Sequence, residues 1–256
     1  MAAVQPMPES GFAPPFNRLA ERDDALASNG FVLLDGPEVL NWLGASPAEL
    51  SGLHEAWNRL PPDPHLLDGG RYRRRRHACY IVNPHHAERQ PPRPHWQPVV
   101  YNALHGGIER WFDAVEPATD ALPIWQSLLK RLAEAASALH GPQPWFIETH
   151  PFRIDTADGI GRPTPEGAHR DGVELVAVML LARHNIKGGE SRIFSANGPD
   201  GKRFTLDRPG ALMLLDDHRI IHETTPIQPL DRGQLGWRDT LVVTCRARAF
   251  QGPNAA

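Results

Sequence analysis

A histidine and an aspartate stand two positions apart in the stretch EGAHRDGVELVAVMLLARHNIKGGES, which runs from Glu166 to Ser191. An apolar, β-rich segment follows this pair, His169 and Asp171, directly. In an extended chain, residues i and i+2 point to the same side, so both side chains could converge on one cation. Sharing a cation would remove the cost of several kcal/mol that burial of unpartnered polar groups carries. The plain alternative is a hydrogen-bonded loop histidine.

A third metal ligand has to come from further along the chain, where three histidines are candidates. His184 stands in a turn, and His218 follows two aspartates in LLDDHRIIHETTPI, which also favours a turn. His222 follows an apolar pair, so we expect its backbone in a core strand. Two histidines and one carboxylate on one face of a metal form the facial triad of non-haem Fe(II) oxygenases. A tetrahedral zinc site remains open, although nothing in the sequence indicates a hydrolase.

Arg238 and Thr240 alternate on one face of the expected last core strand, in WRDTLVVT. An arginine at the start of a strand is usually solvated, or paired at the surface for about 0–1 kcal/mol. The functional interpretation is a guanidinium fork that grips a carboxylate through two parallel hydrogen bonds. The hydroxyl two residues later could add a third bond.

The order His169, Asp171, His222, Arg238 and Thr240 resembles that of Fe(II)/2-oxoglutarate-dependent dioxygenases. The longer strings PEGAHRDG, RHNIKGGES, LLDDHRIIHETTPI and RDTLVVT resemble the bacterial amino-acid hydroxylase group that includes L-isoleucine dioxygenase. The resemblance is specific from about residue 145 to residue 247. Before that it is looser, and only NGFVLLDG and GGRYRRRRHACY look similar.

This resemblance implies both a fold and a set of residue roles. The fold would be α+β, with a double-stranded β-helix (a cupin-like jelly roll) as its core. His169, Asp171 and His222 would hold Fe(II), Arg238 would pair with the distal carboxylate of 2-oxoglutarate, and Thr240 would assist. The reaction would use O₂, release succinate and CO₂, and hydroxylate an unactivated C–H. Because related halogenases lack the carboxylate ligand, Asp171 indicates a hydroxylase.

The helices and strands that must position these residues are expected in two parts of the chain, a helical part followed by a β-rich part. Helical patterns occur in FNRLAERDDALAS, in SPAELSGLHEAWNRL, which opens as a capping box, and in IWQSLLKRLAEAASALHG. From Trp145 onward, short segments rich in β-branched and aromatic residues alternate with turns, as in a sandwich or barrel. We therefore expect a single domain over 1–256, with a helical region at about 16–140 packed on a jelly-roll core at about 145–250.

Composition limits the partners of the chain. The 256 residues are 41% hydrophobic and 22% charged, with a net charge of −3, so no global field would attract nucleic acid or an anionic membrane. The two cysteines form no disulfide framework, and no apolar run approaches the ~20 residues that cross a bilayer. These features predict a cytoplasmic protein that acts on a small molecule, without nucleic-acid or membrane partners. A homodimer is an option for its oligomeric state.

The prediction of a substrate-binding site depends on the arginine-rich run GGRYRRRRHACYIV. In a strand, Arg73 and Arg75 share one face and Arg74 takes the other, so one set could line the metal mouth and bind a substrate carboxylate. A surface ladder of salt bridges is the alternative. Glu148 and His150 precede the core motif and are further candidates for the substrate pocket. His150 departs from the family pattern, which weakens any transfer of substrate identity.

Two classes of function are compatible with these residues. The first is a hydroxylase of a free or N-modified L-amino acid, or of a related carboxylated metabolite. The second is a metal-binding jelly roll that senses or binds without turnover. The Arg238 fork favours the first class, because a bare metal sensor has no use for a carboxylate clamp.

Overall fold

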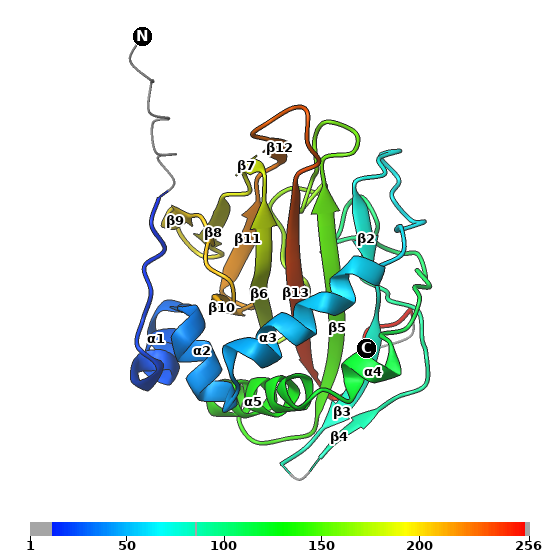
Figure 1. Cartoon of the computed structure of the whole chain (residues 1–256). Coiled ribbons are helices and arrows are strands. Elements are labelled where there is room, and N and C mark those ends of the chain that lie inside the picture. The colour runs from blue at the N-terminus through cyan, green and yellow to red at the C-terminus, as the bar shows by residue number, and fades with distance from the viewer. Residues whose placement is uncertain (1–11, 85, 254–256) are drawn as a thin grey trace.

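A large antiparallel sheet forms the centre of the computed structural model, which describes residues 12–84 and 86–253 (Figure 1). Within this part of the chain the sheet has eight strands. Their order is β1 (Phe31–Leu34), β10 (Leu212–Asp216), β6 (Leu175–His184), β13 (Trp237–Ala247), β5 (Trp145–Asp155), β3 (Ala78–Val82) and β4 (Ala87–Arg89), and β2 (Arg73–Arg75) pairs with β5.

Two smaller sheets complete the β structure. One consists of β11 (Ile220–Thr224), β8 (Ser191–Ser195) and β9 (Gly201–Phe204), and the other of β12 (Ile227–Pro229) and β7 (Ile186–Gly188). A cluster of buried hydrophobic residues joins β6 and β10 to β8 and β9, so the three-stranded sheet packs on the large one. This is the double-stranded β-helix with flanking helices that the sequence predicts.

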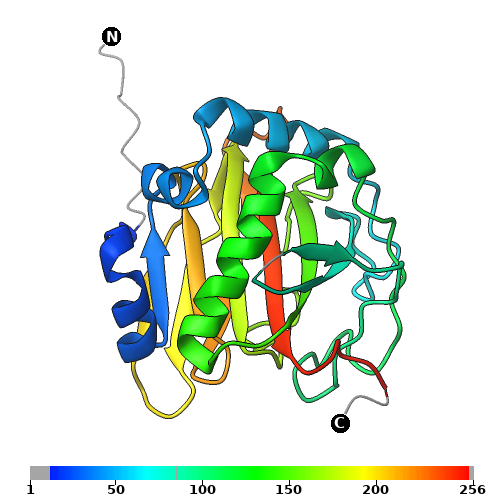
Figure 2. The ribbon, with the colours of Figure 1, turned by 90° about the horizontal axis from the view of Figure 1, so that it is seen from below.

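Helices cover the outer face of the large sheet (Figure 2). The helices are α1 (Arg22–Asn29), α2 (Gly36–Leu43), α3 (Pro47–His54), α4 (Pro117–Asp120) and α5 (Pro123–His140), with short 3₁₀ turns at Leu19–Glu21 and Glu55–Arg59. The predicted capping box of α3 is present, with Ser46 and Glu49 bonded reciprocally. The apolar face of α5 is buried against the sheet, as its 3.6-residue period predicts.

The two faces of the large sheet carry different side chains, as β13 shows. In β13, Leu241, Val243 and Cys245 join the core under the helices. On the other face of the sheet, Arg238 and Thr240 line a cavity. This period of two is why a polar site can lie inside a well-packed molecule.

The expectation of a mainly helical segment at about 16–140 differs from the structure in its middle part. Between α3 and α4 the chain forms strands β2 to β4 and long irregular stretches. This part contains PPDP and QPPRP, and proline removes backbone donors and clashes with helical geometry. None of the helices within residues 12–84 and 86–253 is long and apolar enough to cross a membrane.

Candidate active site

His169, Asp171 and His222 come together at one end of the β core. One potential ligand atom from each lies within 4.8 Å of the others. His169 Nε2 is 3.8 Å from Asp171 Oδ1, and His222 Nε2 is 3.6 Å from Asp171 Oδ2. His218 is exposed and His184 stacks on Trp237, so neither replaces His222 in this group.

The backbone holds the two histidines side by side. The N–H of His169 donates to the carbonyl of His222 at 3.0 Å, and the N–H of His222 donates to the carbonyl of His169 at 2.9 Å. This antiparallel bridge ties the loop before β6 to strand β11, although 53 positions separate the two residues in the sequence. Their rings follow, with centroids 4.6 Å apart.

A buried carboxylate fixes the turn that carries Asp171. Asp217 accepts hydrogen bonds from the backbone N–H groups of Asp171, Gly172 and Val173, at 3.0, 2.7 and 3.1 Å. Gly172 has φ +76°, and a Cβ there would lie 2.4 Å from the ring of Tyr101. The chain can therefore turn sharply after the ligand pair only with glycine at this position.

The protonation pattern of the three side chains suits a divalent cation. His169 Nδ1 lies 2.9 Å from the carbonyl of Gly167, to which it donates as N–H, and this leaves Nε2 free as a ligand. Burial and the neighbouring His169 hold the pKa of His222 well below its usual value, so its ring is neutral. Burial opposes a charge on His169, but the carboxylates of Asp171 and Glu166 raise its pKa, so a bound cation would take the place of a proton there. Two imidazoles and a carboxylate fit Fe(II) with positions left open.

Gln97 orients the carboxylate ligand from the cavity side. Its Nε2 donates to Asp171 Oδ1 at 2.9 Å. Its Oε1 accepts from Asn102 Nδ2 at 3.0 Å and from Arg110 Nη2 at 2.9 Å. Because each polar atom of the amide is occupied in a defined way, the side chain of Asp171 has little freedom to rotate.

Arg238 and Thr240 line the same cavity as the three ligands. Arg238 is 3% exposed, and its Nε and Nη2 have no hydrogen-bond partner among the described residues. Burial, and then the charge of Arg183, lowers its pKa to about 9. A buried cation without a partner is costly, so this site fits an anionic group such as the carboxylate of 2-oxoglutarate.

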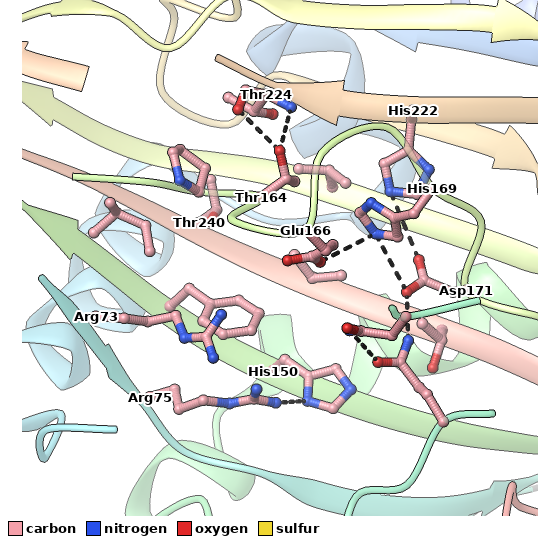
Figure 3. A pocket seen from close by; sticks show the side chains of 18 of the residues that line it. Arg73, Arg75, His150, Thr164, Glu166, His169, Asp171, His222, Thr224 and Thr240 are labelled. Atoms are coloured by element: carbon pink, nitrogen blue, oxygen red, sulfur yellow. Dashed lines mark hydrogen bonds and ion pairs between the residues drawn. The ribbon is translucent and has the colours of Figure 1, made fainter. Parts of the chain in front are cut away.

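Arg73 and Arg75 lie across the cavity from the triad (Figure 3). Both are buried, whereas Arg74 between them is 45% exposed at its side chain. Arg73 Nε donates to Asp63 Oδ2 at 2.6 Å, and Arg75 Nη2 donates to His150 Nδ1 at 2.6 Å. The alternation of the strand therefore turns two arginines toward the site and one toward solvent.

His150 lines the cavity, but Glu148 does not. Glu148 Oε2 lies 2.9 Å from His77 Nε2 and 2.8 Å from His95 Nδ1, and it accepts from both rings. Burial opposes its charge, but the charge of His95 and the two hydrogen bonds hold its pKa well below the usual range. The carboxylate is thus occupied by protein donors.

These four residues, His77, His95, Glu148 and His150, form a second buried group with metal-ligating atoms close together. The tautomers argue against a cation there. Because Arg75 donates to Nδ1 of His150, that ring must carry its proton on Nε2, the atom that faces Glu148 at 3.8 Å. The group is therefore a hydrogen-bonded network that stiffens the wall of the cavity.

Sequence reasoning did not single out several residues that the site uses. Asp217 stands next to a candidate histidine in LLDDHRIIHETTPI, but its three backbone contacts appear only in the folded chain. Gln97 and Arg110 lie in an irregular segment with no motif. Glu166 stands three residues before His169 and lines the cavity.

Comparisons with known proteins agree with this geometry. A family model described as 2OG-Fe dioxygenase matches residues 54–244. A bsmA homolog from Methylobium petroleophilum has a similar solved structure, with 46% identity, a TM-score of 0.89 and coverage of 94% of this chain and 98% of that one. The comparison with curated proteins gave no match.

Two more distant structures share the fold. IDO from Bacillus thuringiensis is 18% identical over 91% of this chain and all of its own (100%), with a TM-score of 0.73. The Fe(II)/α-ketoglutarate-dependent dioxygenase TqaL is 20% identical over 92% of this chain and 88% of its own, with a TM-score of 0.70.

The chain belongs to the 2OG-Fe dioxygenase family, since the family model covers most of it. It is therefore an enzyme that uses Fe(II), 2-oxoglutarate and O₂, and the non-catalytic alternative is set aside. When bound, the iron activates O₂ for oxidation of a C–H bond at the expense of 2-oxoglutarate. The residues of the chain hold, orient and shield the reactants.

Proposed function

We propose that the protein hydroxylates an unactivated C–H of a small carboxylated metabolite, namely a free or N-modified L-amino acid. The observation that carries this proposal is a second cationic site in the cavity. Arg73 and Arg75 are buried there, 5% and 3% exposed, in addition to Arg238. Arg238 would bind the carboxylate of the co-substrate, and Arg73 and Arg75 would bind the carboxylate of the substrate.

In this proposal His169, Asp171 and His222 hold Fe(II), while Arg238 and Thr240 bind 2-oxoglutarate. The cavity that they share supports these roles. Three ligands on one face leave the remaining positions for the co-substrate and O₂. A guanidinium fork is the natural partner of a carboxylate.

The substrate carboxylate would meet Arg73 and Arg75. Arg75 is held between two aromatic rings, with its Cζ 3.8 Å from the centroid of Phe112 and 4.4 Å from that of Phe152. His150 fixes the same guanidinium through Nδ1. A preorganised clamp of this kind loses little side-chain entropy when the ligand binds, and it can hold the target C–H in reach of the metal.

The test is a screen for succinate release with Fe(II), 2-oxoglutarate and ascorbate over the twenty L-amino acids and their N-acyl forms. We expect at least one compound to stimulate release. Arg73→Gln should abolish this stimulation and spare slow uncoupled decay of 2-oxoglutarate. Arg74→Gln is the matched control on the same strand and should keep it, because its side chain faces solvent. Equal loss in both variants would contradict the clamp.

The homodimer and the cytoplasmic location stay predictions. Size-exclusion chromatography with light scattering tests the first, and fractionation of the source cells tests the second.

A further inference from the structure

Glu166 is a largely buried carboxylate that uses only one of its oxygens, because its Oε1 lies 3.6 Å from His169 Nε2. Its side chain is 11% exposed, and its Oε2 has no hydrogen-bond partner among the described residues. Figure 3 shows it in the cavity, between the triad and the side chain of Arg73. A carboxylate in such a place is costly unless a donor or cation reaches it.

Glu166 lies outside the group of side chains that would hold the metal. Glu166 Oε1 is 3.6 Å from His169 Nε2, yet Glu166 is not part of the group of three whose ligand atoms lie within 4.8 Å of one another. His169, Asp171 and His222 already supply a complete facial set. Glu166 therefore lies beside the metal site and faces the space where a substrate would bind.

The lining of the cavity also carries an excess of positive charge. Arg73, Arg75 and Arg110 are all buried, and each has one guanidinium nitrogen without a hydrogen-bond partner in the described part of the chain, namely Nη2, Nε and Nε, respectively. Within the described residues, Asp63 forms an ion pair with Arg73 and with no other arginine. Burial, and then the charge of Arg73, lowers the pKa of Arg110 to about 10. An anionic ligand would relieve this repulsion.

The two charges of the cavity do not neutralise each other directly. Among the described residues, no ion pair of 4.0 Å or less joins Glu166 to any of the three arginines. All four side chains nevertheless line one cavity. An acidic side chain next to the metal ligands and three basic side chains in the same cavity complement the two charges of a small zwitterion.

We propose that Glu166 binds the free ammonium group of the substrate while Arg73, Arg75 and Arg110 bind its carboxylate. This inference rests on the proposed function and narrows it, because it selects free amino acids over N-modified ones. Acylation would remove the positive charge and leave the Glu166 carboxylate buried against a neutral amide. Glu166 is in this sense the residue that determines specificity.

The experiment compares matched ligands in binding as well as in turnover. The probes are L-isoleucine, N-acetyl-L-isoleucine and 3-methylpentanoic acid, followed by the same three forms of any amino acid that the screen selects. Binding is measured by calorimetry without O₂, with Fe(II) and 2-oxoglutarate present, so that no turnover occurs. Succinate release is measured in parallel with O₂, and the iron content of each variant is determined.

We expect the wild-type protein to prefer the free amino acid over both analogues by roughly tenfold to a hundredfold, the usual range for one charge-assisted contact. Glu166→Gln should reduce this preference at least tenfold, with unchanged iron content and an unchanged 2-oxoglutarate requirement. Glu134→Gln, at an exposed position of α5, is the control and should keep the wild-type preference.

Other outcomes separate the two proposals. If the wild-type protein prefers an N-acetyl or deamino form, the ammonium site is refuted and hydroxylation of a carboxylated metabolite stands. An unchanged preference in Glu166→Gln, or loss of iron in that variant, also overturns the role of Glu166. If no amino acid or analogue binds or stimulates succinate release, the proposed function fails and this inference fails with it.

Discussion

At the scale of single residues, unused hydrogen-bonding capacity marks where ligands belong. Arg238 illustrates this, because a guanidinium that is 3% exposed keeps two nitrogens without a partner among the described residues. By contrast, the buried Arg73 forms an ion pair with Asp63, and the partly buried Arg153 forms one with Asp239. The difference indicates that the missing partner of Arg238 is a ligand that binds reversibly.

Arg238→Ala should raise the apparent 2-oxoglutarate requirement sharply, since loss of a charge-assisted bidentate contact typically costs about 2–5 kcal/mol. Arg238→Lys should fall between, because lysine keeps the charge and lacks the fork. The concentration dependence of succinate release measures both. Arg131→Ala, on the exposed face of α5, serves as control. An unchanged requirement in Arg238→Ala would assign the co-substrate to another cation.

The choice between the nearby histidines makes a second prediction at this scale. His222→Ala should lower turnover and bound iron by more than roughly a hundredfold, because even residues that only orient metal ligands contribute about 10–100-fold. His218→Ala should leave both unchanged, since that side chain is exposed. Metal analysis after reconstitution and a turnover assay give the answer. Equal losses in the two variants would mean that the ligand set is wrong.

At the scale of elements, the site depends on how a loop is tied to a strand. The bridge between His169 and His222 and the three backbone contacts of Asp217 fix the turn before β6 from two directions. Strand alternation then places Arg238 and Thr240 on β13, and Arg73 and Arg75 on β2, on the cavity side. Preorganisation therefore comes from backbone geometry rather than from long flexible side chains.

Gly172→Ala should destabilise the fold by at least about 1–2 kcal/mol, because a left-handed conformation disfavours an L side chain. The cost also includes displacement of Tyr101, whose ring lies 2.4 Å from the position of the new Cβ. Denaturant unfolding measures this change. Gly52→Ala in α3, where a Cβ meets nothing within 4 Å, should instead stabilise by about 0.5–1 kcal/mol. Similar stability in both variants would contradict the importance of the turn.

At the scale of the whole molecule, the helices and the outer face of the large sheet enclose one hydrophobic core, which is separate from the core between the two sheets. Leu128 and Leu132 of α5 pack in the same cluster as Leu241 and Val243 of β13. The other face of β13 carries the polar cavity. The apolar core under the helices therefore stabilises the strands that also carry the active site.

Leu128→Ala should lower the free energy of unfolding by about 2–5 kcal/mol, as burial loss and a cavity in a packed core predict. The side chain is 2% exposed. Denaturant unfolding should show a lower midpoint with an unchanged slope. Leu230→Ala, at a side chain that is 58% exposed, should change stability by less than about 0.5 kcal/mol. A small effect of Leu128→Ala would mean that the helical layer is dispensable.

Local signals were sufficient to predict much of this protein. The capping box at Ser46, the β-rich half from Trp145 and the His169 and Asp171 pair follow from spacing, period and composition. The choice of His222 as third ligand and of Arg238 as carboxylate-binding residue came from the resemblance to a known family. Each depends on residues close in sequence, or on a motif whose order is enough to recognise it. The alternation of Arg73 and Arg75 was accessible for the same reason.

Only the tertiary structure decided which side chains stay free to act. Glu148 seemed available from its sequence position, but two distant histidines occupy it. Glu166 carried no local signal, and its Oε2 has no hydrogen-bond partner among the residues that the structure describes. Gln97 contacts a ligand that lies 74 residues away in the sequence. Availability depends on every donor and acceptor that packing brings near, and most of those contacts join residues that are remote along the chain.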